Sequence, residues 1–414
     1  MLVLTTQRIR RLSIASSVVA ILAASSADAL DWQFAPRIEL GGVYNDNYLM
    51  STGVIPEREV SGGRGALALD VTARGQLTET RFVPEIRATY FPDDKDLDST
   101  DKYVRFSWGR KGERSQINFP VYWSDQTIVE AETPAANTPD PILGNPSNVI
   151  GANRILAGNN RQAALTVDPN ALFDLTERTR LDVRADYADV DYDNNVPGNS
   201  VDYRNAGGSL GVDFDLTPTS TLNVRGTYAQ YDPDGAGFGS DGYGVEVTWR
   251  VSATERDQFY VMAGGQRTQF DEDDVVATAE ADEETTFRAG IGAERQWTVT
   301  RMFVDAMYGV DPSATGSVVA RSQLNFRLSR DFSQRTTGRV GVLLLSDEPV
   351  NDDISSVASR EYASGLVGLD VRLSRQFSLA FEYTYTWEDY DDQLGNASSN
   401  AVVISLVYEP GRRN

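Results

Sequence analysis

Cysteine and histidine are both absent from this chain of 414 residues. Without cysteine, neither disulfides nor thiol chemistry can contribute to the fold or to a site. Without histidine, every mechanism that needs an imidazole as base or metal ligand is excluded. Nucleophile elbows, phosphate-binding loops and zinc signatures are missing too. The sequence therefore predicts no enzyme activity, no cofactor and no metal site.

Positive charge and long apolar runs are also scarce. The chain has 38 Lys and Arg residues against 60 Asp and Glu residues, a net charge of −22. Phosphate binding needs a surplus of basic residues, so nucleic acid is excluded as a partner. After the first thirty or so residues, no apolar run reaches the ~18 residues of a transmembrane helix. Any span of a membrane must therefore be made by strands.

The N-terminal segment has the three parts of a secretory signal peptide. A basic region ends at Arg11, residues 12–24 are mostly small and apolar, and residues 27–29 (Ala-Asp-Ala) match a cleavage motif. The apolar run is too short for a membrane anchor. We therefore predict that residues 1–29 are a signal peptide and that residues 30–414 form the mature domain.

An alternation of apolar and polar residues recurs along nearly all the remaining chain. In one segment Leu181 and Val183 fall on one face, and Arg180 and Asp182 fall on the other. A period of two places alternate side chains on opposite faces of a strand. The predicted strands are 34–45, 62–74, 81–91, 102–110, 114–126, 161–169, 178–190, 203–216, 220–231, 243–252, 257–270, 285–297, 300–309, 316–328, 332–345, 360–373, 377–388 and 399–408.

The connections between these strands alternate between short and long. Outer-membrane barrels have short periplasmic turns and long outer loops. The predicted short turns are 78–80, 111–113, 176–177, 217–219, 253–256, 298–299, 329–331 and 374–376. The fold class is therefore all-β, a transmembrane antiparallel up-and-down barrel of about eighteen strands, or sixteen if one hairpin is miscounted. A signal peptide followed by such a barrel predicts an integral protein of a Gram-negative outer membrane.

Residues 127–160 form a connection of a different kind. They are rich in Pro, Asn and Ala, and loops this long are usually functional or disordered. Two interpretations stay open, a constriction folded into the lumen and an exposed loop or lid.

The polar faces of the strands define the candidate site, because a barrel this wide leaves room for a channel. They carry charges of both signs, which fits either a hydrated conduit for a polar or anionic substrate or a set of groups that satisfy one another. The predicted lumen-lining residues are Glu85, Arg87, Arg105, Arg180, Asp182, Arg184, Asp186, Asp213, Arg225, Glu246, Arg250, Arg288, Glu294, Asp305, Arg321, Gln323, Arg339, Asp370, Arg372 and Glu382.

Two stretches resemble a known family. Residues 42–47 (Gly-Val-Tyr-Asn-Asp-Asn) are similar to the opening of the β-barrel porin 2 family, and residues 360–385 resemble its closing hairpin. Several members of that family are associated with exopolysaccharide or capsule systems. The resemblance implies an outer-membrane conduit for polysaccharide export, with a periplasmic polysaccharide export protein as partner.

Three functional hypotheses follow. The leading one is a passive conduit for exopolysaccharide or capsule export. The second is a general or sugar-selective diffusion porin, and the third is a structural or adhesion barrel with a blocked lumen. In every case the expected surroundings are outer-membrane lipid and lipopolysaccharide, and the pattern favours no particular oligomeric state.

Overall fold

The computed structural model describes residues 30–52, 56–132, 160–193, 200–234, 239–270, 283–313, 316–350, 359–391 and 395–410. The predicted signal peptide and most of the 127–160 connection lie outside these residues. The strands are β1 (Asp31–Asn45), β2 (Val60–Arg74), β3 (Thr78–Tyr90), β4 (Ser99–Lys111), β5 (Ser115–Thr127), β6 (Arg161–Val167), β7 (Asn170–Asp174), β8 (Thr179–Tyr192), β9 (Tyr203–Thr217), β10 (Ser220–Pro233), β11 (Ser240–Thr254), β12 (Asp257–Phe270), β13 (Glu283–Gln296), β14 (Thr300–Pro312), β15 (Val318–Ser333), β16 (Thr336–Pro349), β17 (Arg360–Arg372), β18 (Phe377–Tyr390) and β19 (Asn396–Tyr408).

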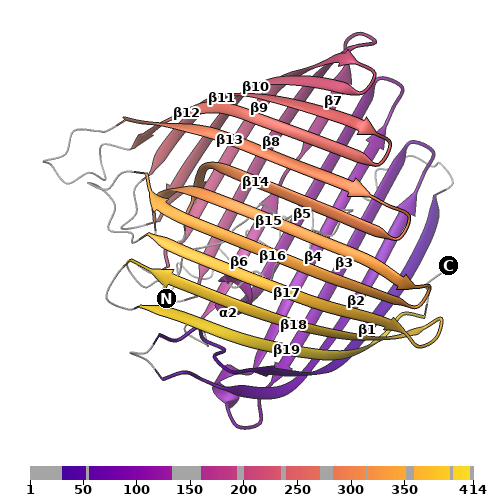
Figure 1. The fold of residues 1–414 in the computed structure, drawn as a ribbon, viewed down its shortest axis with the longest axis vertical. Coiled ribbons are helices and arrows are strands. Elements are labelled where there is room, and N and C mark those ends of the chain that lie inside the picture. Colours follow the sequence, from indigo (N-terminus) through magenta and orange to yellow (C-terminus); the bar gives the residue numbers. More distant parts are fainter. Residues whose placement is uncertain are drawn as a thin grey trace, which may run out of the picture.

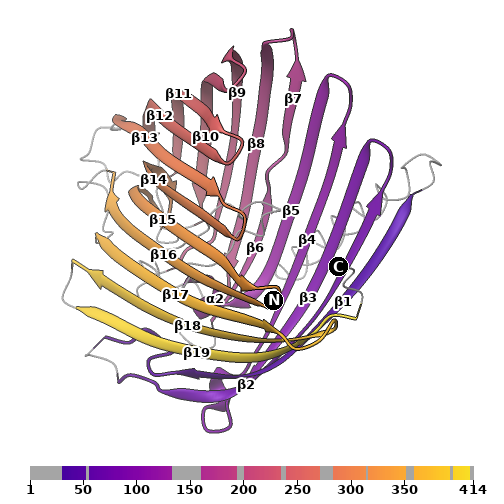
Figure 2. The same ribbon diagram turned by 45° about the vertical axis from the view of Figure 1, so that its right-hand side comes forward.

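All the strands form one closed antiparallel sheet (Figures 1 and 2). Each strand pairs with its neighbours in the chain, and β1 closes the ring by pairing with β19, from Ile38 opposite Tyr408 to Asn45 opposite Ala401. Both β6 and β7 pair with β5 on one side and β8 on the other, so they are two halves of one interrupted strand. The wall therefore has eighteen strand positions, as the sequence predicts.

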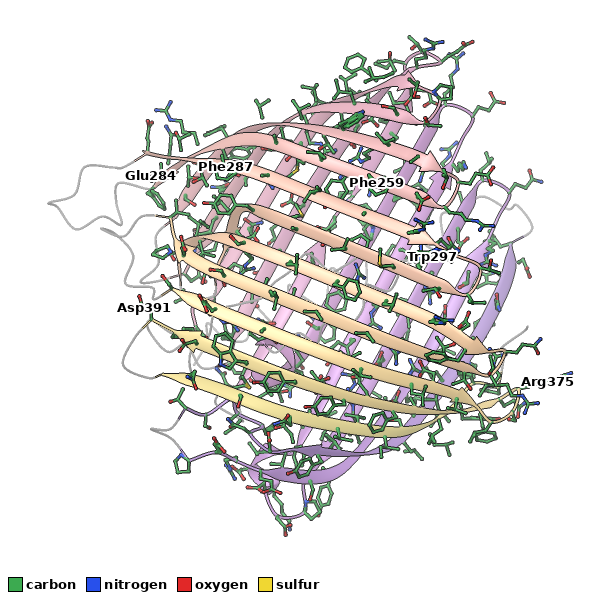
Figure 3. The ribbon with its side chains drawn as sticks, viewed as in Figure 1. Phe259, Glu284, Phe287, Trp297, Arg375 and Asp391 are labelled. Atoms are coloured by element: carbon green, nitrogen blue, oxygen red, sulfur yellow. The ribbon has the colours of Figure 1, made fainter. Side chains whose placement is uncertain are left out.

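The outside of the wall is apolar, as contact with lipid requires. Large exposed side chains such as Leu210, Val245 and Ile291 project from the strands between the two rims. Figure 3 places Phe287 and Phe259 on this surface, between Glu284 at the long-loop rim and Arg375 at a short turn. Trp108, Trp123 and Trp387 also lie at outward-facing positions, which is typical of interfacial girdles.

Both described ends of the chain lie at the same rim as the short turns. Asp31 is opposite Arg74, next to the first short turn, and Tyr408 is opposite Phe377, next to the last one. In the described residues, two short helical elements lie at the opposite, long-loop rim: η1 (Lys95–Leu97) and α2 (Ile128–Glu132). Among the residues that the structure describes, no helix is long and apolar enough to cross a membrane.

The structure corrects three predicted boundaries. The first short turn is at 75–77 and not at 78–80, because Gly75 N–H donates to the carbonyl of Thr78 and β3 begins there. The turn expected at 329–331 lies at 334–335, and β15 runs on to Ser333 with an irregularity between Asp331 and Ser333. The sixth strand, expected at 161–169, breaks at 168–169 and resumes as β7.

The assignment of faces predicts a large difference between two adjacent residues of β9. Leu210 is 60% exposed on the lipid side, at the middle of its strand, whereas Ser209 faces the lumen. Leu210→Arg is expected to destabilise the folded barrel by roughly 2–4 kcal/mol, the cost of a cation near the bilayer midplane. Ser209→Arg, at the same depth, should cost little. Urea titration of the barrels in lipid vesicles measures both, and equal losses would contradict the assigned faces.

Candidate functional site

The inner surface of the barrel carries the predicted site. Residues paired across antiparallel strands share a face, and the registers form an unbroken chain of inward pairs, such as Arg105 opposite Tyr122 and Arg225 opposite Glu246. By this register all twenty predicted side chains face the lumen. For Gln323 and Arg372, only the register assigns the side chain to the lumen. Most of the other eighteen residues take part in the polar contacts described next.

One group of charged side chains is centred on Arg225. Its Nη2 lies 2.6 Å from Asp182 Oδ2 and its Nη1 lies 3.0 Å from Glu246 Oε1. Arg184 bonds the same Asp182 at 2.9 Å, and Arg288 approaches Glu246 at 3.6 Å. Asp182 is only 1% exposed, so its charge depends on these partners. Nearby, Arg180 and Arg250 lie 3.7 Å and 4.0 Å from Asp213.

Two further groups and three separate pairs account for most of the remaining predicted residues, while Asp186 belongs to none of them and lines the cavity described below. Glu85 accepts from Arg87 at 3.0 Å and from Arg105 at 3.2 Å. Arg339 contacts Asp370 at 3.0 Å and Glu382 at 3.9 Å. The remaining members have partners that the sequence did not suggest: Glu294 with Arg301, Asp305 with Tyr260, and Arg321 with Asp347.

Sequence reasoning missed several lumen residues. Asp347, Arg360 and Glu388 lie at the long-loop ends of β16, β17 and β18, and the Arg360–Glu388 distance is 3.2 Å. Arg360 and Glu388 could have been found by extending the same alternation to the strand ends. Asp168 lies within the strand predicted at 161–169, where the alternation placed it on the polar face, but it was not included among the predicted lumen residues. Glu130 lies where no strand was expected, so the alternation gave no signal for it.

Glu130 belongs to α2, which folds into the barrel from the end of β5 (Figure 2). Its carboxylate lies 3.1 Å from Arg87 and 3.9 Å from Arg64, both on the inner wall. Burial alone would raise the pKa of Glu130, but the two arginines outweigh burial and lower it. The first residues of the 127–160 connection therefore enter the lumen, as a constriction requires. Residues 133–159 lie outside the described part of the chain.

An apolar cluster surrounds α2 at the long-loop end of the lumen. Ile128 and Val129 pack with inward-facing side chains from many strands, including Val190, Tyr231 and Phe270. Ile128 is 0% exposed. The cluster joins elements from β1 to β19, so buried apolar side chains occupy a region that an open pore would leave to water.

Beneath this cluster lies a cavity of about 420 Å³. Charged side chains line it, among them Arg184, Arg288 and Asp186, together with the polar groups of Ser209, Gln266 and Thr268. Glycines on the inner face make room for them. A Cβ at Gly207 would lie 2.5 Å from both carboxylate oxygens of Asp186. The cavity is large enough for a small hydrophilic solute and is formed by β7 to β15.

The closed wall, the apolar outside and the charged lumen together decide the class of protein. This chain is an integral outer-membrane β-barrel. No protein-family model and no curated protein matches it. The specific resemblance to the porin 2 family therefore stays a prediction.

Several solved structures are similar to this chain in overall fold. Pseudomonas aeruginosa OccK2 in complex with glucuronate is 8% identical, with 92% of this chain and 98% of that chain covered and a TM-score of 0.46. Pseudomonas aeruginosa OpdK with vanillate is 9% identical, with 91% and 99% covered and a TM-score of 0.47. Acinetobacter baumannii OccAB1 is 10% identical, with 94% and 98% covered and a TM-score of 0.45.

Removing the central arginine of the lumen should weaken the fold. Arg225→Ala leaves the carboxylates of Asp182 and Glu246 short of a buried partner, and breaking a buried pair typically costs about 3–5 kcal/mol. Arg204→Ala is the matched control, because Arg204 is half exposed and its carboxylate partners lie 3.8 Å and 3.9 Å away. Such surface pairs contribute less than about 1 kcal/mol. Similar unfolding free energies for both variants in urea would show that the lumen pairs are fully solvated.

The inward position of α2 generates a prediction about conductance. Ile128→Asn combined with Glu130→Ala removes both the apolar and the ionic anchor of α2, so the single-channel conductance should rise. Glu361→Ala, on the exposed outer face of β17, should leave conductance unchanged. Planar-bilayer recording compares the three proteins. An unaltered conductance in the double variant would show that α2 does not narrow the path.

Proposed function

We propose that this protein is a passive diffusion channel for small polar solutes, and not an enzyme. The observation that carries this proposal is the charged cavity of about 420 Å³ within the lumen, beneath the apolar cluster around α2. Small-molecule sites are usually concave spaces of this order, with a few fixed polar groups. Of the three hypotheses from the sequence, the sugar-selective porin fits this lumen best.

The inner wall supports passage of hydrated solutes. Arg184 and Arg250 are both 45% exposed in their side chains, although Arg184 also bonds a buried carboxylate. Charges held in this way offer hydrogen bonds to a passing solute while remaining in contact with water. The predicted lumen residues include ten arginines and nine carboxylates, so the wall offers both signs of charge to a polar solute.

An exopolysaccharide conduit is less well supported. An extended polymer needs a continuous polar path from one rim to the other, and its length keeps every part of that path occupied at once. In the described residues, Tyr48, Ile128 and Phe270 belong to one buried apolar cluster near the long-loop rim. Export of exopolysaccharide, and a periplasmic export protein as partner, would require this cluster to rearrange.

Solute flux separates these functions. In liposome swelling assays, the purified barrel should admit monosaccharides and disaccharides and exclude long oligosaccharides, because the cavity limits the size of the solute. Barrels unfolded by heat before reconstitution provide the control. In a deletion strain, secreted polysaccharide should be unchanged. Loss of secreted polymer, with no swelling by small sugars, would overturn the proposal in favour of export, and the absence of any flux would favour a structural barrel.

A further inference from the structure

Two carboxylates face each other in the wall of the lumen cavity. Val167 is opposite Tyr187 and Asn170 is opposite Arg184, so the same register sets Asp168 opposite Asp186. Both residues line the cavity. Side chains directly opposite on neighbouring strands have Cβ atoms about 4.5–5.5 Å apart, and like charges placed in this way destabilise a sheet.

Most charged side chains of the lumen have an ionic partner, but among the described residues this pair has none. Within the described part of the chain, no lysine or arginine lies within ion-pair distance of Asp168 or Asp186. Oδ1 of Asp168 is buried and has no hydrogen-bond partner there. Of the arginines of the cavity, Arg184 and Arg225 are bonded to Asp182 and Glu246. Arg288 acts on Asp186 only from beyond ion-pair distance and lies 3.6 Å from Glu246. The two carboxylates therefore keep acceptor oxygens that are open to a donor entering the cavity.

The break in the sixth strand holds Asp168 in this position. Pro169 has no N–H, so the ladder is interrupted at 168–169 while its carbonyl still accepts from Ala185 at 3.0 Å. Asp168 N–H donates to the carbonyl of Pro120 on β5 at 3.2 Å. The backbone is thus held on both sides, so the Cβ of Asp168 stays opposite that of Asp186.

A second, independent feature of the same cavity also lacks a partner. Thr268 lines the cavity from β12 and is only 1% exposed, yet its hydroxyl has no hydrogen-bond partner among the described residues. Buried polar groups are nearly always hydrogen-bonded, and an unsatisfied one costs about 1–3 kcal/mol. An incoming solute with hydroxyl groups would satisfy Thr268, just as a cationic group would satisfy the two carboxylates.

We propose that Asp168 and Asp186 form a binding subsite for the ammonium group of a small hydroxylated solute, of the aminosugar class. The inference rests on the proposed function and names the substrate class of the same cavity. An ammonium has three N–H donors and needs few acceptors. A calcium ion would require about six to eight oxygen ligands, more than this pair supplies. The chemistry of the two carboxylates therefore favours the amine.

The test uses glucosamine as the probe and N-acetylglucosamine as its neutral counterpart. Binding of each sugar to the full barrel in detergent is measured by titration calorimetry, and interruption of the single-channel current is measured in bilayers. Wild type should bind glucosamine more tightly than N-acetylglucosamine. Asp168→Asn and Asp186→Asn should each weaken glucosamine binding by about tenfold, the loss expected for one charge-assisted hydrogen bond.

Asp189→Asn is the matched control, because Asp189 lies on the same strand as Asp186 but faces outward. It should bind glucosamine like wild type. Heat-modifiable migration on gels verifies that each variant is folded. Equal binding of glucosamine by wild type and both cavity variants would overturn the subsite. If wild type carries no current at all, the proposed channel fails, whereas the calorimetric comparison still decides the subsite.

Discussion

The rest of the structure depends on the closure of the sheet. In a bilayer every backbone N–H and C=O must find a partner within the protein, and an open sheet edge would leave a row of them unpaired. The pairing of β1 with β19 removes the last edge. Once the ring is closed, each strand has one face toward lipid and one toward the lumen, so a period of two in the sequence becomes a difference between inside and outside.

Closure also explains why the lumen is rich in ion pairs. The inner face must be polar for a channel to hold water, yet the strands bring those side chains into close contact, so their charges lose much of their hydration. Arg225 recovers interaction energy from two carboxylates on different strands, and Arg321 does so from Asp347 at 2.6 Å. Removing such charges from water carries a desolvation penalty, and short, charge-assisted hydrogen bonds offset this penalty. The wall is therefore rigid where its charges are paired.

Much of the fold was predictable because the alternation of each strand is local. The faces of Val224 and Arg225 can be assigned from their own strand, and neighbouring strands confirm them. Turn positions were harder, since the polar residues 329–331 are tolerated within a strand near the aqueous rim. Contacts between side chains of elements that are distant in the sequence were not predictable. The position of Glu130 beside Arg87 depends on how α2 enters the lumen, which no periodicity encodes.

The break between β6 and β7 at Asp168 and Pro169 is a departure from regular strand pairing that lies beside the cavity. A proline inside a paired strand sacrifices one ladder bond, and a carboxylate opposite another carboxylate adds repulsion. A regular strand without a break, such as the neighbouring β8, would avoid both costs. Both occur at one level of the wall, beside a cavity and facing Asp186, while every neighbouring charge is compensated. Two carboxylates that face each other beside a cavity, without an ion pair among the described residues, are more simply explained by a ligand than by the fold, because the fold gains nothing from them.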